Sequence, residues 1–176
     1  MNTYKVLFRI ACFLNISTLF LPWWSKFEIY DRMHSDAFLF GILKYYVDPP
    51  PAVWAYPSSK ATLLFETWSN IYLPFMLIII ILVCVGSFCY FKASMMNSVT
   101  HYLGSIGCLF SVVALLSFIF SITTFNGSLG FVGAISAPSW VDWGPDIGFF
   151  LMLFSTTLSL IGLFIATKDL RIRIRL

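Results

Sequence analysis

Four long apolar runs, separated by polar segments, set the pattern of this chain. A helix that crosses a bilayer needs about 20 mainly apolar residues. Four segments meet this requirement: about 6–23, 71–91, 102–125 and 147–167, and the last three contain no charged residue. Because lipid offers no partner to an unpaired backbone amide, each run should be helical. The pattern predicts an all-α transmembrane four-helix bundle in a single membrane domain.

The two segments that connect these runs on one side have a different pattern. Residues 24–70 begin with alternating polar and apolar positions, and Ala37–Val47 is rich in aromatic and branched residues, so both stretches are typical of strands. Residues 61–68 fit either a strand or the start of the second helix. In residues 126–146, three glycines favour a hairpin or tight turns. We therefore expect a small antiparallel β-sheet, formed mainly by the first loop, at the outer end of the bundle.

The first apolar run meets the first strand at Leu21, Pro22, Trp23 and Trp24. Pro22 is expected to end the first helix, since the residue before a proline avoids helical geometry. Tryptophan is enriched at the level of the lipid headgroups. Because two adjacent side chains cannot share a face, we expect one tryptophan to be packed and the other to anchor in lipid. This structural junction would hold the sheet rigidly on the bundle.

The composition supports membrane insertion, and the charge distribution predicts its direction. The chain is 59% hydrophobic and 11% charged, whereas soluble domains have about 25% charged residues. Four spans place both termini on one side. That side carries seven basic residues, Lys5, Arg9, Lys92, Lys168, Arg171, Arg173 and Arg175, against Lys26, Arg32, Lys44 and Lys60 on the other. Basic residues favour the cytoplasm, so we expect a multi-pass protein of the cell membrane with both termini cytoplasmic. The loop at 92–101 and the tail at 168–176 would share that side.

The tail carries the lipid-facing basic residues Lys168, Arg171, Arg173 and Arg175. They either attract anionic lipid or only stop the fourth span from moving further. On the outer side, Asn126 begins an Asn-Gly-Ser sequon that a glycosylating host could modify.

The chemistry that the sequence lacks narrows the function. The chain shows no nucleotide loop, nucleophile motif, zinc pattern or basic nucleic-acid patch, and no acidic or basic residue lies in the middle of a span, as proton relays require. His34 lies among Asp31, Arg32 and Asp36, in a polar turn or a weak metal or proton site. We expect no catalytic, cofactor-binding or metal-binding residue, no cofactor beyond structural lipids, and no nucleic-acid partner.

Polar and sulfur-containing residues inside the spans are expected to serve packing. The four cysteines, Cys12, Cys84, Cys89 and Cys108, lie within spans and should act as buried small hydrophobes. Asn15 is the one strongly polar residue well inside a span. It could hydrogen-bond between helices together with the hydroxyl-bearing residues Ser17, Thr18, Ser105, Ser111, Ser117, Ser155, Thr156, Thr157 and Ser159. Gly104 and Gly107 would allow those helices to approach closely.

The junction also carries a resemblance to a known family. A first span that ends in Leu21-Pro22-x-Trp24 and leads directly into a strand resembles the claudin-type tetraspan membrane proteins. The long first loop, the shorter second loop, and Gly144 and Gly148 at the fourth span are similar too. The family's paired loop cysteines are absent. The resemblance implies a four-helix bundle with a small outer sheet, and it favours Trp24 as the packed tryptophan.

These observations lead to one functional hypothesis and two alternatives. We expect a non-enzymatic membrane protein that associates with other proteins, laterally or between cell surfaces, through its extracellular loops. The candidate contact residues are Phe38, Trp54, Tyr56, Trp140, Asp142 and Trp143. For the last three, a tryptophan belt before a helix start at Asp146 is the simpler interpretation. The alternatives are an accessory subunit of a large respiratory or oxygenase complex and, less favoured, an oligomeric channel subunit. The partners would be membrane lipids and other membrane subunits or further copies of the chain.

Overall fold

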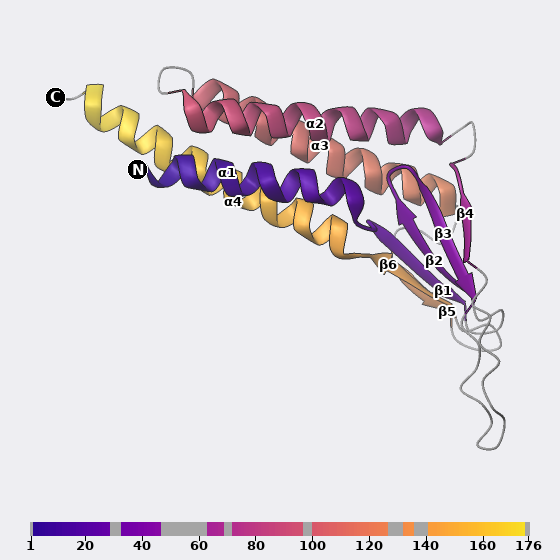
Figure 1. Ribbon diagram of the computed structural model, residues 1–176. Coiled ribbons are helices and arrows are strands. Elements are labelled where there is room, and N and C mark those ends of the chain that lie inside the picture. The colour runs from indigo at the N-terminus through magenta and orange to yellow at the C-terminus, as the bar shows by residue number, and fades with distance from the viewer. Residues whose placement is uncertain are drawn as a thin grey trace.

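Four helices run side by side in the computed structural model, which describes residues 2–28, 33–46, 63–68, 72–96, 100–126, 132–135 and 141–174. They are α1 (Thr3–Ser17), α2 (Leu73–Met95), α3 (Thr100–Asn126) and α4 (Ile147–Ile174), with a short 3-10 helix, η1 (Thr18–Phe20), after α1. By length and composition, all four are able to cross a membrane, α1 together with η1. α1 packs against α2 and α4, and α3 packs against the same two helices. Both termini lie at one end of the bundle, and a sheet extends from the other (Figure 1).

The sheet is antiparallel and combines strands from both loops. The strands are β1 (Trp24–Glu28), β2 (Met33–Phe38), β3 (Gly41–Tyr46), β4 (Leu63–Glu66), β5 (Gly133–Ile135) and β6 (Val141–Pro145). Their spatial order is β4-β3-β2-β1-β6-β5. β1 pairs with both β2 and β6, so the strand that follows α1 lies beside the strand that precedes α4. The prediction of a small antiparallel sheet built mainly by the first loop is confirmed.

Two details of the strand prediction were wrong. The stretch Ala37–Val47 is not one strand, because the chain turns at Leu39 and Phe40 and forms the β2–β3 hairpin. His34 lies in β2 rather than in a polar turn. Around the turn, Phe38, Leu39 and Phe40 are all large and apolar, so periodicity gives no sign of a turn there. Leu39 is fully buried although it lies at the turn.

The helix boundaries also differ from the predicted spans. α1 ends at Ser17 and η1 at Phe20, so the helix stops before Pro22. Leu21, the residue before Pro22, is extended, with φ −110° and ψ 151°. This is the geometry expected of a residue that precedes proline. At the other end of the chain, α4 continues to Ile174, so most of the predicted tail is helical. Backbone hydrogen bonding continues past the point where the apolar run stops.

Two glycines of α3 allow the close helix contacts that the sequence predicted. A Cβ on Gly104 would lie 2.6 Å from the Phe8 ring of α1, and one on Gly107 would lie 2.7 Å from the Tyr90 ring of α2. Both distances are too short for a side chain. At these two positions, α3 therefore lets the Phe8 ring of α1 and the Tyr90 ring of α2 approach to a distance that only glycine permits.

A chain of hydrogen bonds crosses the centre of the bundle and joins all four helices. Asn15 donates from Nδ2 to Ser111 Oγ at 3.2 Å, and the hydroxyls of Ser111 and Tyr90 are 3.0 Å apart. Tyr90 donates to Ser159 Oγ at 2.8 Å, and Ser159 donates to the Thr156 carbonyl at 2.7 Å. Since each hydroxyl has one proton, Ser111 must donate to Tyr90. We call this series the polar chain.

The polar chain predicts that Tyr90→Phe destabilises the bundle by about 1 kcal/mol, the usual size of a hydrogen bond between membrane helices. The loss follows because Ser111 loses its acceptor and Ser159 loses its donor. Thermal unfolding in detergent measures the effect. Tyr102→Phe is the matched control, since Tyr102 is 75% exposed. Equal stability of the two variants would contradict the structural role of the chain.

Candidate functional site at the junction of sheet and helices

The residues of the Pro-Trp-Trp junction are held by backbone hydrogen bonds to β2 and to the start of α4. The Trp23 amide donates to the Ala37 carbonyl of β2 at 2.8 Å, and the Trp23 carbonyl accepts from the Asp146 amide at 3.0 Å. The Pro22 carbonyl accepts from the Gly148 amide of α4 at 2.7 Å. The junction therefore ties the first loop to the start of the last helix.

The Trp23 side chain fills the space between the helix ends. Its indole Nε1 donates to the Thr18 carbonyl at 2.7 Å, and its ring lies 4.9 Å from the Phe118 ring of α3, at an angle of 57°. Trp24, one residue later, lies opposite Ala37 of β2 and Pro145 of β6 in the sheet. The two tryptophans are 0% and 3% exposed and belong to one hydrophobic cluster.

This arrangement corrects the prediction for the tryptophan pair. We expected one packed tryptophan and one lipid anchor, but both are buried, and Trp23 is the deeper of the two. Adjacent side chains do point in different directions. Both side chains are nevertheless buried, because the cluster that contains them includes helix residues such as Phe118 and sheet residues such as Ala37.

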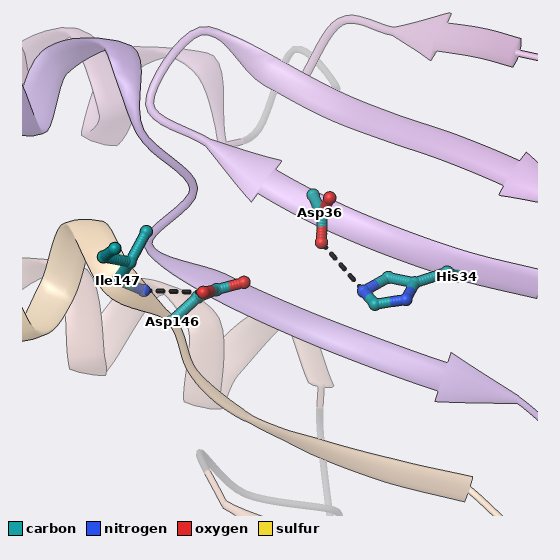
Figure 2. Close-up of polar contacts among 4 residues, drawn as sticks. All are labelled: His34, Asp36, Asp146 and Ile147. Carbon is teal, nitrogen blue, oxygen red and sulfur yellow. Dashed lines mark hydrogen bonds and ion pairs between the residues drawn. The ribbon is translucent and has the colours of Figure 1, made fainter.

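Only one of the two glycines that carry the resemblance is required sterically. A Cβ on Gly148 would lie 2.7 Å from both the Pro22 carbonyl oxygen and the Trp23 ring. A Cβ on Gly144 would meet its nearest neighbour, Val132, at 3.8 Å. Gly148 therefore lets the first turn of α4 approach the junction. Asp146 precedes that turn and accepts a hydrogen bond from the Ile147 amide at 2.6 Å (Figure 2), as expected for an acid at a helix start.

Asp142 and Trp143, which we selected as contact residues, face opposite sides of β6. Trp143 is 7% exposed and belongs to the same cluster as Trp23, so it offers little surface to a partner. Asp142 is exposed and lies opposite Phe27 of β1. Three other predicted residues, Trp54, Tyr56 and Trp140, lie outside the described residues.

His34 and Asp36 contact each other on β2. His34 Nε2 lies 2.9 Å from Asp36 Oδ1 (Figure 2), and the His34 ring is 5.9 Å from the Phe27 ring. No group of three or more potential metal ligands occurs in the part of the chain that the structure describes. Both side chains are partly buried, with 29% and 17% of their surface exposed.

An exposed aromatic surface remains on the part of the sheet nearest to the helices. Phe40 at the β2–β3 turn is 46% exposed, and Phe65 of β4 is 53% exposed. The rings of Phe38 and Phe40 stack with their centroids 5.7 Å apart, while Phe65 lies against Gly41. We call Phe38, Phe40 and Phe65 the aromatic rim. The sequence indicated Phe38 alone, because the hairpin that exposes Phe40 was not predicted.

The rim is anchored to the buried cluster from behind. Trp68 is 3% exposed, and its indole Nε1 donates to the Phe38 carbonyl at 2.9 Å. Leu39, between Phe38 and Phe40, is fully buried in the same cluster as Trp23. Lys44 of β3 and Glu66 of β4 form an ion pair at 2.7 Å, which joins β3 to the strand that carries Phe65.

The remaining predicted residues are at the ends of helices. Asn126 is the last residue of α3, and its side chain lies outside the described part. Lys168 is exposed on α4, Arg171 and Arg173 lie on its last turns, and Arg175 falls beyond the described residues. Cys12, Cys89 and Cys108 are buried as predicted, whereas Cys84 is exposed.

Tyr90 was not among the residues that we predicted to matter. It is fully buried and joins α2 to both α3 and α4. The only signal in the sequence was a single hydroxyl-bearing aromatic late in the second apolar run.

No protein-family model and no curated protein matches this chain.

The burial of Trp23 predicts that Trp23→Ala lowers the free energy of unfolding by about 3–5 kcal/mol, the usual cost of removing a buried large aromatic. Trp24→Ala should also destabilise the protein, but less, because only the Trp23 variant also removes the hydrogen bond to Thr18 and the contact with Phe118. Thermal unfolding in detergent provides the comparison. Phe20→Ala is the control, since Phe20 is 69% exposed, and it should resemble the wild type. A Trp23→Ala variant as stable as this control would refute the account of the junction.

Proposed function

We propose that this chain is a non-enzymatic, multi-pass protein of the cell membrane whose sheet lies outside the cell. The outward faces of the helices support the membrane placement. They expose large apolar side chains, including Phe13 at 71%, Phe120 at 65% and Phe164 at 73%. Apolar surface on this scale is unusual in water but is suited to lipid. The excess of basic residues at the end that carries both termini supports a cytoplasmic location for that end.

The function that we propose is lateral association with other membrane proteins through the outer sheet. The observation that carries this proposal is the exposure of Phe40 and Phe65 on a sheet whose backbone is bonded to the helices. Exposed aromatic residues are enriched where proteins meet. β4, which carries Phe65, stands at one end of the strand order, and such a strand is open to a partner.

The position of the aromatic rim favours a partner in the same membrane. The rim adjoins Leu39 and Trp68, which are buried in the cluster at the helix ends. A neighbouring membrane protein could contact a rim so close to the helix ends without a long segment outside the membrane. A claudin-like relation remains part of the proposal, supported by the junction and by a sheet to which both loops contribute.

The proposed topology predicts opposite labelling of two engineered cysteines. In a variant without the four native cysteines, Ser58→Cys should react with a membrane-impermeant thiol reagent on intact cells. Leu176→Cys should react only after the cells are permeabilised. The reverse pattern would place the sheet in the cytoplasm and overturn the orientation.

The proposed interface predicts that the double variant Phe40→Ser and Phe65→Ser weakens association by about tenfold or more, equivalent to ~1.4 kcal/mol. Serine removes apolar contact area that a partner would bury. Energy transfer between labelled copies in lipid vesicles measures self-association, and purification in mild detergent measures retained partners. Val132→Ser, at a residue 63% exposed beside the opposite edge of the sheet, is the matched control.

Each outcome of this experiment has a distinct meaning. Loss of self-association in the double variant alone supports the proposal with another copy as the partner. Loss of a retained complex of fixed stoichiometry supports association as an accessory subunit. Unchanged association in a variant of normal stability would show that the aromatic rim only contacts lipid headgroups.

A further inference from the structure

A cavity opens on α4 at the end of the bundle that carries both termini. Its volume is about 470 Å³, and its described lining residues come from one helix: Leu160, Leu163, Phe164, Thr167 and Lys168. The volume lies in the usual range for small-ligand sites. The lining residues are apolar except for Thr167 and Lys168. We call this cavity the α4 groove.

The basic positions of α4 continue the line of the groove. Positions 164, 168 and 171 are spaced i, i+4 and i+7, so they share one face of the helix. Arg173 lies nine residues after Phe164, about two and a half turns on, and therefore on the opposite face. Asp169, the one acidic residue of this segment, is also on that opposite face. One face of α4 thus passes from apolar residues to cationic positions without an intervening acid.

This part of α4 stands at the edge of the bundle. Figure 1 shows the last turns of the helix projecting beyond the start of α1. Phe164 is 73% exposed and Leu160 is 50% exposed, so the groove opens outward. In a bilayer, this geometry places apolar walls at the depth of the acyl chains and the cationic positions at the level of the headgroups.

We propose that the α4 groove binds an anionic phospholipid. One acyl chain lies along Leu160, Leu163 and Phe164, and the headgroup phosphate pairs with Lys168, with position 171 one turn further on. This inference rests on the membrane placement in the proposed function. It adds a defined lipid site to the general attraction expected of a basic tail. A free phosphate ion would leave the apolar walls uncovered, whereas a neutral lipid would offer no net negative charge to Lys168.

The test measures lipid retention by the full-length protein in a neutral detergent. The protein is given equal amounts of phosphatidylglycerol and phosphatidylcholine with identical acyl chains, and native mass spectrometry counts the lipids that remain bound. The wild type should retain phosphatidylglycerol preferentially. Lys168→Gln and Arg171→Gln should each reduce that preference about fivefold, the effect of one cation near an anionic headgroup.

Two further variants separate this site from its alternatives. Arg173→Gln removes the same charge from the opposite face of the helix and should keep the wild-type preference. Thr167→Trp fills the groove and should reduce retention of both lipids. Circular dichroism and thermal unfolding verify that each variant is folded.

Several results would overturn the proposal. Equal losses in Arg171→Gln and Arg173→Gln would show diffuse attraction by the tail rather than a site. Equal retention of the two lipids by the wild type would exclude a headgroup preference. Displacement of the lipid by inorganic phosphate at the same concentration would favour a free anion, and dimers lost only in Thr167→Trp would identify a second copy as the occupant. None of these readouts involves the aromatic rim or the labelling of termini, so failure here is distinguishable from failure of the proposed function.

Discussion

The fixed position of the Trp23 backbone is the constraint on which the rest of the structure depends. Its amide bonds to β2 and its carbonyl accepts from Asp146 at the start of α4. The Trp23 ring packs against the Phe118 ring of α3. A sheet that met the bundle only through a flexible loop could rotate, whereas this one is attached where β1 begins and where β6 ends. The orientation of every residue on the sheet therefore follows from the helices.

Packing within the bundle rests on two clusters and on the polar chain. The cluster around Trp23 lies at the sheet end, and a second cluster, which includes Phe8 and Tyr90, lies toward the termini. In lipid, burial of apolar side chains adds little driving force, because the tails are as apolar as the side chains. Close contact at Gly104 and Gly107, together with directional hydrogen bonds from Asn15 to Ser159, supplies the specificity instead.

The two proposed surfaces lie at opposite ends of the molecule and have different chemistry. The aromatic rim is apolar, belongs to the sheet and suits a protein partner. The α4 groove combines apolar walls with cations and suits a lipid. A lipid held at the terminal end would fix the depth of α4 in the bilayer. Through Gly148 and the junction, that depth would also set the height of the rim.

The sequence by itself determined the four helices, since each coincides with a long apolar run that is apparent without any tertiary contact. It also placed most of the sheet in the first loop, and Asn15, Ser111 and Ser159 were among the polar residues that it named as possible links between helices. The alternation and composition of a segment report its local preferences. Helices, strands and polar residues within apolar runs could therefore be predicted from the sequence.

The tertiary structure decided the features that depend on distant partners. Trp23 and Trp24 are both buried because β2, α3 and α4, which lie elsewhere in the sequence, all meet at this junction. The turn at Leu39 lies in an apolar run, and the core that receives this side chain is built mostly by other segments. Tyr90 is a link only because Ser111 and Ser159 stand opposite it. Periodicity tells which face of an element is apolar, but not what lies against that face, and that information exists only once the chain has folded.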